Sequence, residues 1–417
     1  MEAAVVAGVV SVSPKLLVCG DLMVVSGDTK FFAANYKEAN NDDLFIYDCS
    51  TASKKLQEKQ DSEVGKPLGK TNTILACAFS STGKFFVLTD DNKQLILFCT
   101  KPSWECLSIR PVMRRCTSLL ITSAEDKILV ADKSGDVYSY SITEPKNAGT
   151  IELGHLSLLL DLTLSPDDQY IVTADRDEKI RVSLMKAPHV IVSFCLGHRE
   201  FVSRILVLPN FPDHLLSASG DGTLRLWKYK SGKELHCFQL NNLNINEAGK
   251  HEKKYTVSRI AYHCEGNYIA VLYDCIPAVS IFQLDAGAQS LISKQHIILS
   301  HKGWDVAFEE TGGLWVLQEN QQIPLLFYQP EDGQWQPIID KKELVKMSKY
   351  ICDHWRMFEG AMDKGSCFQN IYKVPFDNMS IYLKKKEERL HQQKNKRKDP
   401  QYESSEQTKK VRTEELS

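Results

Sequence analysis

The side chains best suited to acid–base chemistry occur in two similar segments of the chain. Each segment holds a histidine, a hydroxyl residue and an aspartate in the same order: His155, Thr173 and Asp177, then His198, Ser217 and Asp221. A histidine paired with a carboxylate is able to move protons in an active site. The two sets repeat one another, however, and a pairing that recurs from repeat to repeat indicates a structural device rather than a catalytic one.

A third segment resembles a phosphate-binding loop. Residues 65–71 end in Gly-Lys-Thr, but Val64 stands where the motif requires its first glycine. The motif also requires a helix after it, whereas Ile74–Phe79 is typical of a strand. No nucleophile elbow or dinucleotide fingerprint occurs in the sequence. The chain is therefore not expected to be an enzyme, and we assign it no catalytic residue, cofactor or small-molecule substrate.

The 12 cysteines give no sign of a metal site or a disulfide framework. They occur singly in apolar stretches such as Ala76–Ala78, and no CxxC pair is present. We expect free thiols that act as small buried hydrophobic groups in a reducing compartment. No apolar stretch approaches the roughly 20 residues that span a bilayer. The net charge of −2 does not suit a surface that binds polyanions throughout.

The elements that would position these side chains form a repeat. The clearest unit runs from Gly197 to Trp227, and the unit from Gly154 to Ser183 aligns with it; their Gly-His pairs lie about 43 residues apart, as in a WD repeat. Weaker copies of the closing strand occur at Leu44–Tyr47, Leu95–Phe98, Val137–Tyr140, Val279–Phe282 and Leu325–Tyr328. Two long spacings contain polar insertions expected to be surface loops, Ser53–Lys70 and Asn241–Lys254. About seven copies predict an all-β fold, a seven-bladed WD40 β-propeller over residues 1–340.

One unit carries the full set of polar residues that ties such a repeat together. His198, Ser217, Asp221 and Trp227 match the buried hydrogen-bonded tetrad of a WD repeat. The aspartate is expected to accept from the histidine, the serine to link the strand to the histidine, and the indole N–H to complete the chain, so that each polar group is satisfied. The preceding unit has Ser183 in place of the tryptophan, so we expect that blade to be held less tightly.

One turn is more charged than a propeller requires. Asp175–Arg181 carries several charges of both signs, whereas a blade needs only one aspartate there. Lys133, in the corresponding turn of the preceding unit, would lie beside it. A solvated turn explains this pattern. A docking rim also explains it, because mixed charges specify partner and register more than they supply affinity.

The character of the chain changes after about residue 341. Residues 341–359 and 379–398 are predicted to be helical, within a mostly helical extension over 341–390, and residues 391–417 form a basic tail too poor in apolar residues to fold. Its basic side chains, with those of the preceding helix, are Lys384, Lys385, Lys386, Lys394, Lys396, Arg397, Lys398, Lys409, Lys410 and Arg412. A bipartite nuclear-import signal and contact with RNA phosphates compete with plain solubility as their function. We therefore expect a nuclear protein, with the cytoplasm as a further location.

Several segments together resemble the family of WD-repeat non-catalytic subunits of the tRNA (guanine-N7)-methyltransferase. They are Asp43–Ser50, Val130–Ser139, Leu164–Asp168, Thr173–Ser183, Phe194–Ile205, Trp304–Gln318 and Tyr382–Leu390. The resemblance spans most of the chain, and Thr173–Ser183 and the C-terminal helix are its most specific parts.

This resemblance implies a scaffold subunit. Its partner would be a Rossmann-type catalytic subunit, bound as a heterodimer, that holds S-adenosylmethionine and methylates N7 of a guanine in the tRNA variable loop. The propeller would dock side-on, stabilise that subunit and help to position the tRNA. The implied docking residues are Lys133, Asp177, Glu178, Lys179 and Arg181. Asp177 is also the aspartate that aligns with Asp221 of the tetrad, so its role is either docking or structural. A general nuclear protein-interaction hub or a ubiquitin-ligase substrate receptor is the alternative function.

Overall fold

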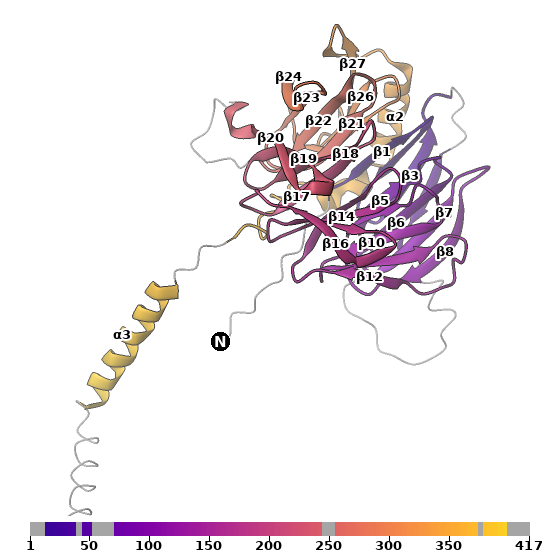
Figure 1. Cartoon of the computed structure of the whole chain (residues 1–417). Helices are drawn as coiled ribbons and strands as arrows, with labels where there is room; N and C mark the ends of the chain where they lie inside the picture. The colour runs from indigo at the N-terminus through magenta and orange to yellow at the C-terminus, as the bar shows by residue number, and fades with distance from the viewer. Residues whose placement is uncertain (1–12, 39–43, 52–70, 244–254, 374–377, 398–417) are drawn as a thin grey trace, which may run out of the picture. The chain divides into compact units, whose positions relative to one another are not determined.

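A ring of β-sheets makes up most of the chain. The computed structural model describes residues 13–38, 44–51, 71–243, 255–373 and 378–397. Its strands form seven four-stranded antiparallel sheets, each built from strands that follow one another in the sequence (Figure 1). The first strand of each sheet lies innermost, against the first strands of the two neighbouring sheets. The predicted seven-bladed β-propeller is confirmed.

The blades are numbered in chain order. Blades 1 and 2 comprise β1 (Lys15–Cys19), β2 (Leu22–Ser26), β3 (Lys30–Asn35) and β4 (Phe45–Asp48), then β5 (Ile74–Phe79), β6 (Phe85–Asp90), β7 (Gln94–Cys99) and β8 (Glu105–Pro111). Blades 3 and 4 comprise β9 (Cys116–Ile121), β10 (Lys127–Asp132), β11 (Asp136–Ser141) and β12 (Thr150–Gly154), then β13 (Leu159–Leu164), β14 (Tyr170–Asp175), β15 (Ile180–Leu184) and β16 (Ala187–Cys195). Blade 5 comprises β17 (Val202–Leu208), β18 (Phe211–Ser219), β19 (Thr223–Lys228) and β20 (Lys233–Gln239), with the short helices η1 (Tyr229–Ser231) and η2 (Leu240–Leu243). Blades 6 and 7 comprise β21 (Val257–His263), η3 (Glu265–Asn267), β22 (Tyr268–Tyr273), β23 (Ala278–Asp285) and β24 (Ser290–Ile298), then β25 (Gly303–Phe308), β26 (Leu314–Gln318), β27 (Leu325–Glu331) and β28 (Gln334–Pro337).

The hydrophobic core lies between neighbouring blades rather than at one centre. The second strand of a blade is buried along nearly its whole length, as in β14, because other blades cover both faces of its sheet. Val172 and Val182 of blade 4, for example, pack in one cluster with Leu215 and Trp227 of blade 5. Each blade therefore completes the core of the next.

Six of the seven predicted closing strands hold the same place in their sheets. They belong to the third strands β7, β11, β15, β19, β23 and β27. The copy predicted at Leu44–Tyr47 is wrong, because Phe45–Asp48 forms β4, the fourth and outermost strand of blade 1. The third strand of that blade is β3, in which Phe31 to Ala34 are buried.

Some segments singled out in the sequence lie outside the described residues. They include the insertion Ser53–Lys70, residues 244–254 of the second insertion, and all but Thr71 of the segment that resembles a phosphate-binding loop. The prediction that a strand follows that segment is confirmed, because β5 spans Ile74–Phe79.

After β28 the chain forms a strap, residues 341–372, that holds the first and last blades together. Its helix α2 (Lys342–Asp353) is followed by the 3-10 helix η4 (Trp355–Ala361), so the helix predicted over 341–359 is confirmed in its first part and tightens after His354. Met347, Ile351 and Phe358 pack in one cluster with side chains of blades 1 and 7. No strand is exchanged between those two blades in the described sheets. Direct packing of the two blades, the strap, and a hydrogen bond from the Leu16 N–H to Asp305 (2.9 Å) therefore close the ring.

The strap then crosses the upper face, defined as the face that carries the turns between the second and third strands of the blades. Phe368 stacks on Phe201 with ring centroids 5.3 Å apart, and the Tyr372 hydroxyl hydrogen-bonds to Thr256. Phe368 also lines a cavity of about 540 Å³ among the innermost strands. The strap thus covers the upper face at the centre of blades 4 to 6.

The chain divides into two compact units, Met1–Tyr372 and Lys373–Ser417. The first unit includes the strap, although the sequence pattern groups that segment with the extension. The second contains helix α3 (Asn378–Arg397), which runs past the boundary expected at residue 390; residues 398–417 lie outside the described part.

The cysteines differ from expectation in their burial. All are free thiols, but only Cys49, Cys116, Cys195 and Cys367 are buried, and Cys264 and Cys275 are exposed. The small-hydrophobe role therefore holds for a minority of them. Within the described part of the chain, no helix is long and apolar enough to cross a membrane.

Candidate functional site

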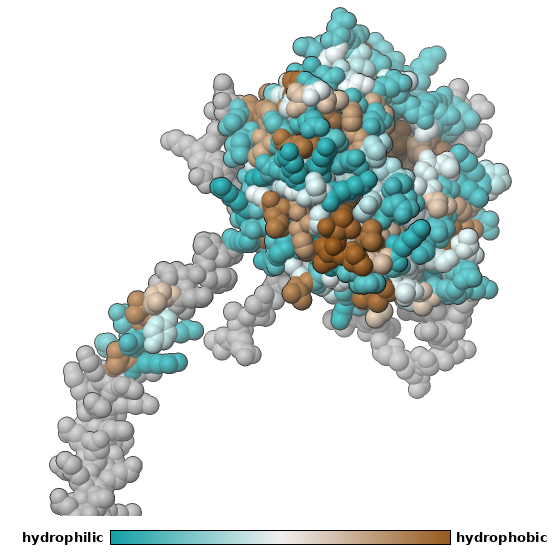
Figure 2. All heavy atoms as spheres, viewed as in Figure 1, coloured by the Kyte–Doolittle hydropathy of each residue, from teal (hydrophilic) through white to brown (hydrophobic). Residues whose placement is uncertain are grey.

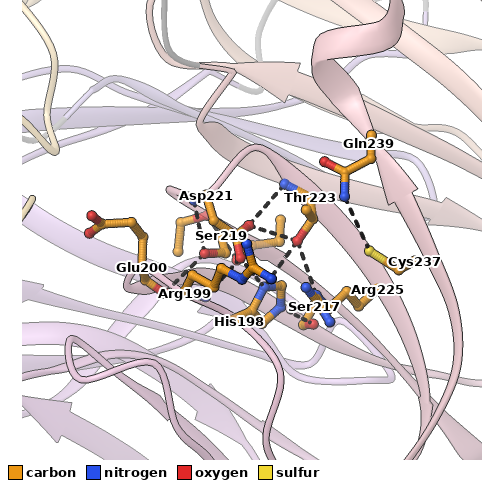
Figure 3. A network of polar contacts seen from close by, with 12 residues as sticks. His198, Arg199, Glu200, Ser217, Ser219, Asp221, Thr223, Arg225, Cys237 and Gln239 are labelled. Carbon is orange, nitrogen blue, oxygen red and sulfur yellow. Dashed lines mark hydrogen bonds and ion pairs between the residues drawn. The ribbon is translucent and has the colours of Figure 1, made fainter.

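The tetrad of blade 5 forms as predicted and leaves none of its polar groups free for chemistry; Figure 3 labels three of its members, His198, Ser217 and Asp221. The Trp227 indole N–H donates to the Ser217 hydroxyl oxygen (2.8 Å), which lies 2.7 Å from Nε2 of His198. Nδ1 of His198 lies 3.1 Å from the Asp221 carboxylate. All four residues are buried or nearly so. A closed chain of this kind pins strands and turns together, because each donor has its acceptor.

The charge states in this network follow from burial and hydrogen bonding. Burial lowers the pKa of His198, although Asp221 opposes that effect, so we assign the neutral imidazole at pH 7. Burial would raise the pKa of Asp221, but hydrogen bonds from His198, Thr223 and the Arg199 N–H outweigh it and lower the pKa well below its ordinary value. A neutral histidine beside an ionised aspartate, both fully bonded, is a structural pair.

Blade 4 corrects the prediction that Asp177 belongs to the tetrad. His155 contacts Thr173 (2.7 Å) and the carboxylate of Asp175 (3.2 Å) instead. The other oxygen of Asp175 accepts from the Lys179 N–H at 3.0 Å and so closes the turn. Asp175 is buried, whereas Asp177 is exposed at the tip of that turn. The alignment failed because blade 5 has Ser219 where blade 4 has Asp175, two residues before the predicted position.

The turn between β14 and β15 therefore presents its charges to solvent. Asp177 and Lys179 are exposed, and Glu178 is half-buried with a positive φ of 71°. Lys133 is exposed in the turn between β10 and β11, the corresponding turn of the neighbouring blade 3. The structure thus brings four of the predicted docking residues to the upper rim of blades 3 and 4.

Arg181, the fifth predicted residue, is anchored in the protein. Its guanidinium donates to the Ser183 hydroxyl (3.0 Å) and to the backbone carbonyls of Gly154 (3.0 Å) and Pro188 (2.9 Å). Arg181 therefore links β12, β15 and β16. Ser183, which aligns with Trp227 of blade 5, accepts a hydrogen bond from Arg181. Burial lowers the Arg181 pKa, but an arginine remains charged at pH 7.

The charge of Arg181 has no counterion in the described part of the chain. No carboxylate there lies within salt-bridge distance of its guanidinium, in contrast to Arg225 of blade 5, which pairs with Glu234. Carbonyl dipoles alone compensate the cation, and the side chain is only half-buried. An acidic group on a partner would complete the pairing.

Arg176, in the same turn, is a residue that sequence reasoning missed. Its Nε donates to the Ile371 carbonyl at 3.2 Å, so the end of the strap is attached to the charged turn. The two residues are 195 positions apart, and nothing in the local pattern of either segment indicates their contact.

The basic residues near the C-terminus separate into three groups. Lys384, Lys385 and Lys386 are exposed on α3. Lys394, Lys396 and Arg397 lie in the last turns of the same helix. Lys398, Lys409, Lys410 and Arg412 lie outside the described residues.

The fold and the tetrad define this chain as a WD-repeat propeller. Solved structures agree at the level of the fold: the structure entitled "Structure of U3-55K" has a TM-score of 0.57 at 17% identity and covers 79% of this chain and 93% of that one. The crystal structure of RRP9 WD40 repeats has a TM-score of 0.58 at 18% identity, over 74% of this chain and 88% of that one.

Sequence comparison identifies the family. The family model described as "tRNA methyltransferase TRM82 WD40 domain" matches residues 35–152 and 141–323. The tRNA (guanine-N(7)-)-methyltransferase non-catalytic subunit WDR4 of Homo sapiens is 52% identical over 89% of this chain and 89% of that protein, and wdr4 of Danio rerio is 45% identical over 90% and 92%. The corresponding subunit wuho of Drosophila melanogaster is 30% identical over 80% and 78%.

This chain belongs to the family of WD-repeat non-catalytic subunits of the tRNA (guanine-N7)-methyltransferase. The family resemblance seen in the sequence is thereby confirmed, as is the prediction that the chain is a non-catalytic subunit.

Proposed function

We propose that this chain holds a catalytic tRNA (guanine-N7)-methyltransferase subunit against the side of blades 3 and 4, stabilises it and helps to position tRNA for N7-methylguanosine formation. The catalytic subunit would bind S-adenosylmethionine, so the propeller needs no cofactor. The relatives' names support the identity of the partner enzyme, and the charged surface of blades 3 and 4 supports the proposed docking place.

The charged turn of blade 4 is the main support for this docking position. Asp177 and Lys179 are exposed on a turn that the buried Asp175 closes through His155 and the Lys179 N–H, and Glu178 lies between them. Freed from the tetrad, the Asp177 charge is available to a partner. Arg181, below the turn, lacks a carboxylate among the described residues. Charges of both signs in fixed positions suit a docking rim that selects one partner and one register.

Lys133 and Lys179 give the sharpest test, because both side chains are exposed and neither forms a salt bridge within the described part of the chain. The Lys133→Glu, Lys179→Glu double variant should pull down less methyltransferase and lower tRNA N7-methylguanosine in cells, with thermal unfolding unchanged. Lys294→Glu, at another exposed lysine on β24, is the matched control. An unaltered complex in the double variant, or a pull-down that contains no methyltransferase, would remove the docking assignment.

The basic C-terminal region is proposed to contact tRNA phosphates and to direct the protein to the nucleus. Lys384, Lys385 and Lys386 are exposed on α3 and form a run of three cations. For each phosphate that is no longer neutralised by a lysine, the slope of log affinity against log salt should fall by about one. Replacing the three lysines with glutamine should therefore weaken tRNA binding by the full complex and flatten its salt dependence. Replacing the basic residues at 409–412 should shift a fluorescent fusion toward the cytoplasm, without loss of methylation by purified complex.

A further inference from the structure

A strip of exposed apolar side chains runs along the outer edges of blades 3 and 4. Figure 2 shows a dense hydrophobic patch where Figure 1 places β12 and β16. Its residues, here called the apolar strip, are Ile151, Leu156, Val190, Ile191, Val192, Phe194 and Leu196. Leu156 is fully exposed, and Leu196 and Ile151 are 63% and 56% exposed. Contiguous apolar surface of this kind on a soluble protein marks an interaction site or an aggregation hazard.

Irregular pairing of β16 is the reason that so many consecutive apolar residues face solvent. In a regular strand alternate side chains point to opposite faces, so only every second residue would be exposed. Here the register of β16 against β15 shifts between Ser193 and Ile191, which leaves Val192 as an extra residue. It shifts a second time between Ile191 and Ala187. A bulge of this kind re-aims side chains and ends regular pairing at a sheet edge. Val190, Ile191 and Val192 are therefore exposed together.

The apolar strip is continuous with the charged turn. Arg181 lies directly opposite Phe194 in the sheet, and its guanidinium donates to the carbonyl of Pro188, also in β16. The same guanidinium donates to Gly154 at the end of β12. One half-buried cation thus stands between the two strands that carry the strip, next to the mixed charges at 177–179. An apolar centre with charged groups at its edge is the usual anatomy of a protein–protein interface.

The strap restricts where a partner is able to bind. On the upper face, Phe368 stacks on Phe201, and the Ile371 carbonyl accepts a hydrogen bond from Arg176. The propeller's own chain therefore fills the surface nearest the central cavity, whereas the outer strands β12 and β16 carry exposed apolar groups. A partner that reaches the charged turn would meet the side of the propeller.

From these contacts we infer that the apolar strip is the energetic centre of the interface with the catalytic methyltransferase subunit, and that the charged turn is its rim. This inference rests on the proposed function. It requires an apolar surface on the catalytic subunit, flanked by an acidic group that meets Arg181. Affinity then comes from the buried strip, whereas the charges at 133 and 177–179 set association rate and register.

The test measures binding of the purified full-length chain to the purified catalytic subunit at two salt concentrations. Ile151→Glu and Leu196→Glu should each weaken the Kd by about tenfold or more, mainly through faster dissociation, as for central interface residues. Their melting temperatures should match the unsubstituted protein. Ile298→Glu is the matched control, because Ile298 is 72% exposed on β24, the outer strand of blade 6. It should change Kd less than twofold.

The outcomes separate this inference from the proposed function. If the strip variants bind normally while Lys133→Glu, Lys179→Glu weakens the complex, the apolar strip is not the interface but the docking turn stands. If the strip variants weaken binding and the turn variant does not, the strip is the interface, but the charged turn is not its rim and the docking turn must be reassigned. If neither weakens it, both are wrong. If the free chain self-associates and Ile151→Glu makes it monomeric without altering the complex, the strip is a contact between copies, and the inference is overturned.

Discussion

Replacing Asp175 with alanine should destabilise the propeller, whereas replacing Asp177 with alanine should not. Asp175 is 2% exposed and accepts from both His155 and the Lys179 N–H. Its loss leaves the His155 ring and the Lys179 N–H without this buried acceptor, beneath a turn whose tip is exposed. An unsatisfied buried polar group costs about 1–3 kcal/mol. Because water is able to reach part of the turn, we expect about 2–3 kcal/mol for the substitution as a whole.

Differential scanning calorimetry translates that loss into a melting temperature. A folded unit of about 360 residues has an unfolding entropy of about 0.75 kcal/mol per kelvin, so Asp175→Ala should lower Tm by about 3–4 °C. Asp177→Ala should leave Tm within about 1 °C, as for other exposed turn positions. The same Asp177 variant should weaken binding of the catalytic subunit if the charged turn docks as proposed.

The refuting result is a reversal of this pattern. If Asp177→Ala melts early and Asp175→Ala does not, the tetrad of blade 4 uses the residue that sequence alignment selected, and the assignment made from the hydrogen bonds is wrong. Asp221→Ala in blade 5 serves as a positive control, because its carboxylate accepts from His198, the Thr223 hydroxyl and the Arg199 N–H.

Three further predictions follow from the same contacts. Arg181→Glu should lower Tm as well as weaken the complex, because the substitution removes three hydrogen bonds that link β12, β15 and β16; calorimetry and pull-down together check this, and an unchanged Tm would contradict it. Phe358→Ala should lower the free energy of unfolding, measured by chemical denaturation, by about 3–5 kcal/mol, because it removes a fully buried ring between the first and last blades. Val345→Ala, on the exposed side of α2, should leave that free energy nearly unchanged. Stability should fall between pH 7.5 and 5.5, because burial lowers the pKa of His198 in the folded state while the unfolded chain takes up protons near its ordinary value of about 6.5. The unfolded state then binds more protons as the pH drops, so His198→Gln should flatten the dependence of Tm on pH, and an equal slope in both proteins would argue against it.

The repeat and the tetrad of blade 5 were predictable because their signals are local. A blade is four short strands joined by tight turns, so its alternation and turn residues recur at a regular spacing in the sequence. His198, Ser217, Asp221 and Trp227 follow one another within a single repeat, and their identities suffice to predict the network. The same local reading failed for Leu44–Tyr47, where the fourth strand of blade 1 looks like a third one.

The sequence by itself determined the propeller, the family and the over-charged turn at 175–181. Tertiary structure decided which of these charges are free. It placed Asp175 rather than Asp177 against His155, anchored Arg181 on three strands, and attached Arg176 to Ile371 at the far end of the strap. It also exposed the apolar strip, which the sequence shows only as one more hydrophobic strand. Local patterns fix which residues form a strand or turn, but which side chains remain available to a partner depends on segments that meet only when the ring closes.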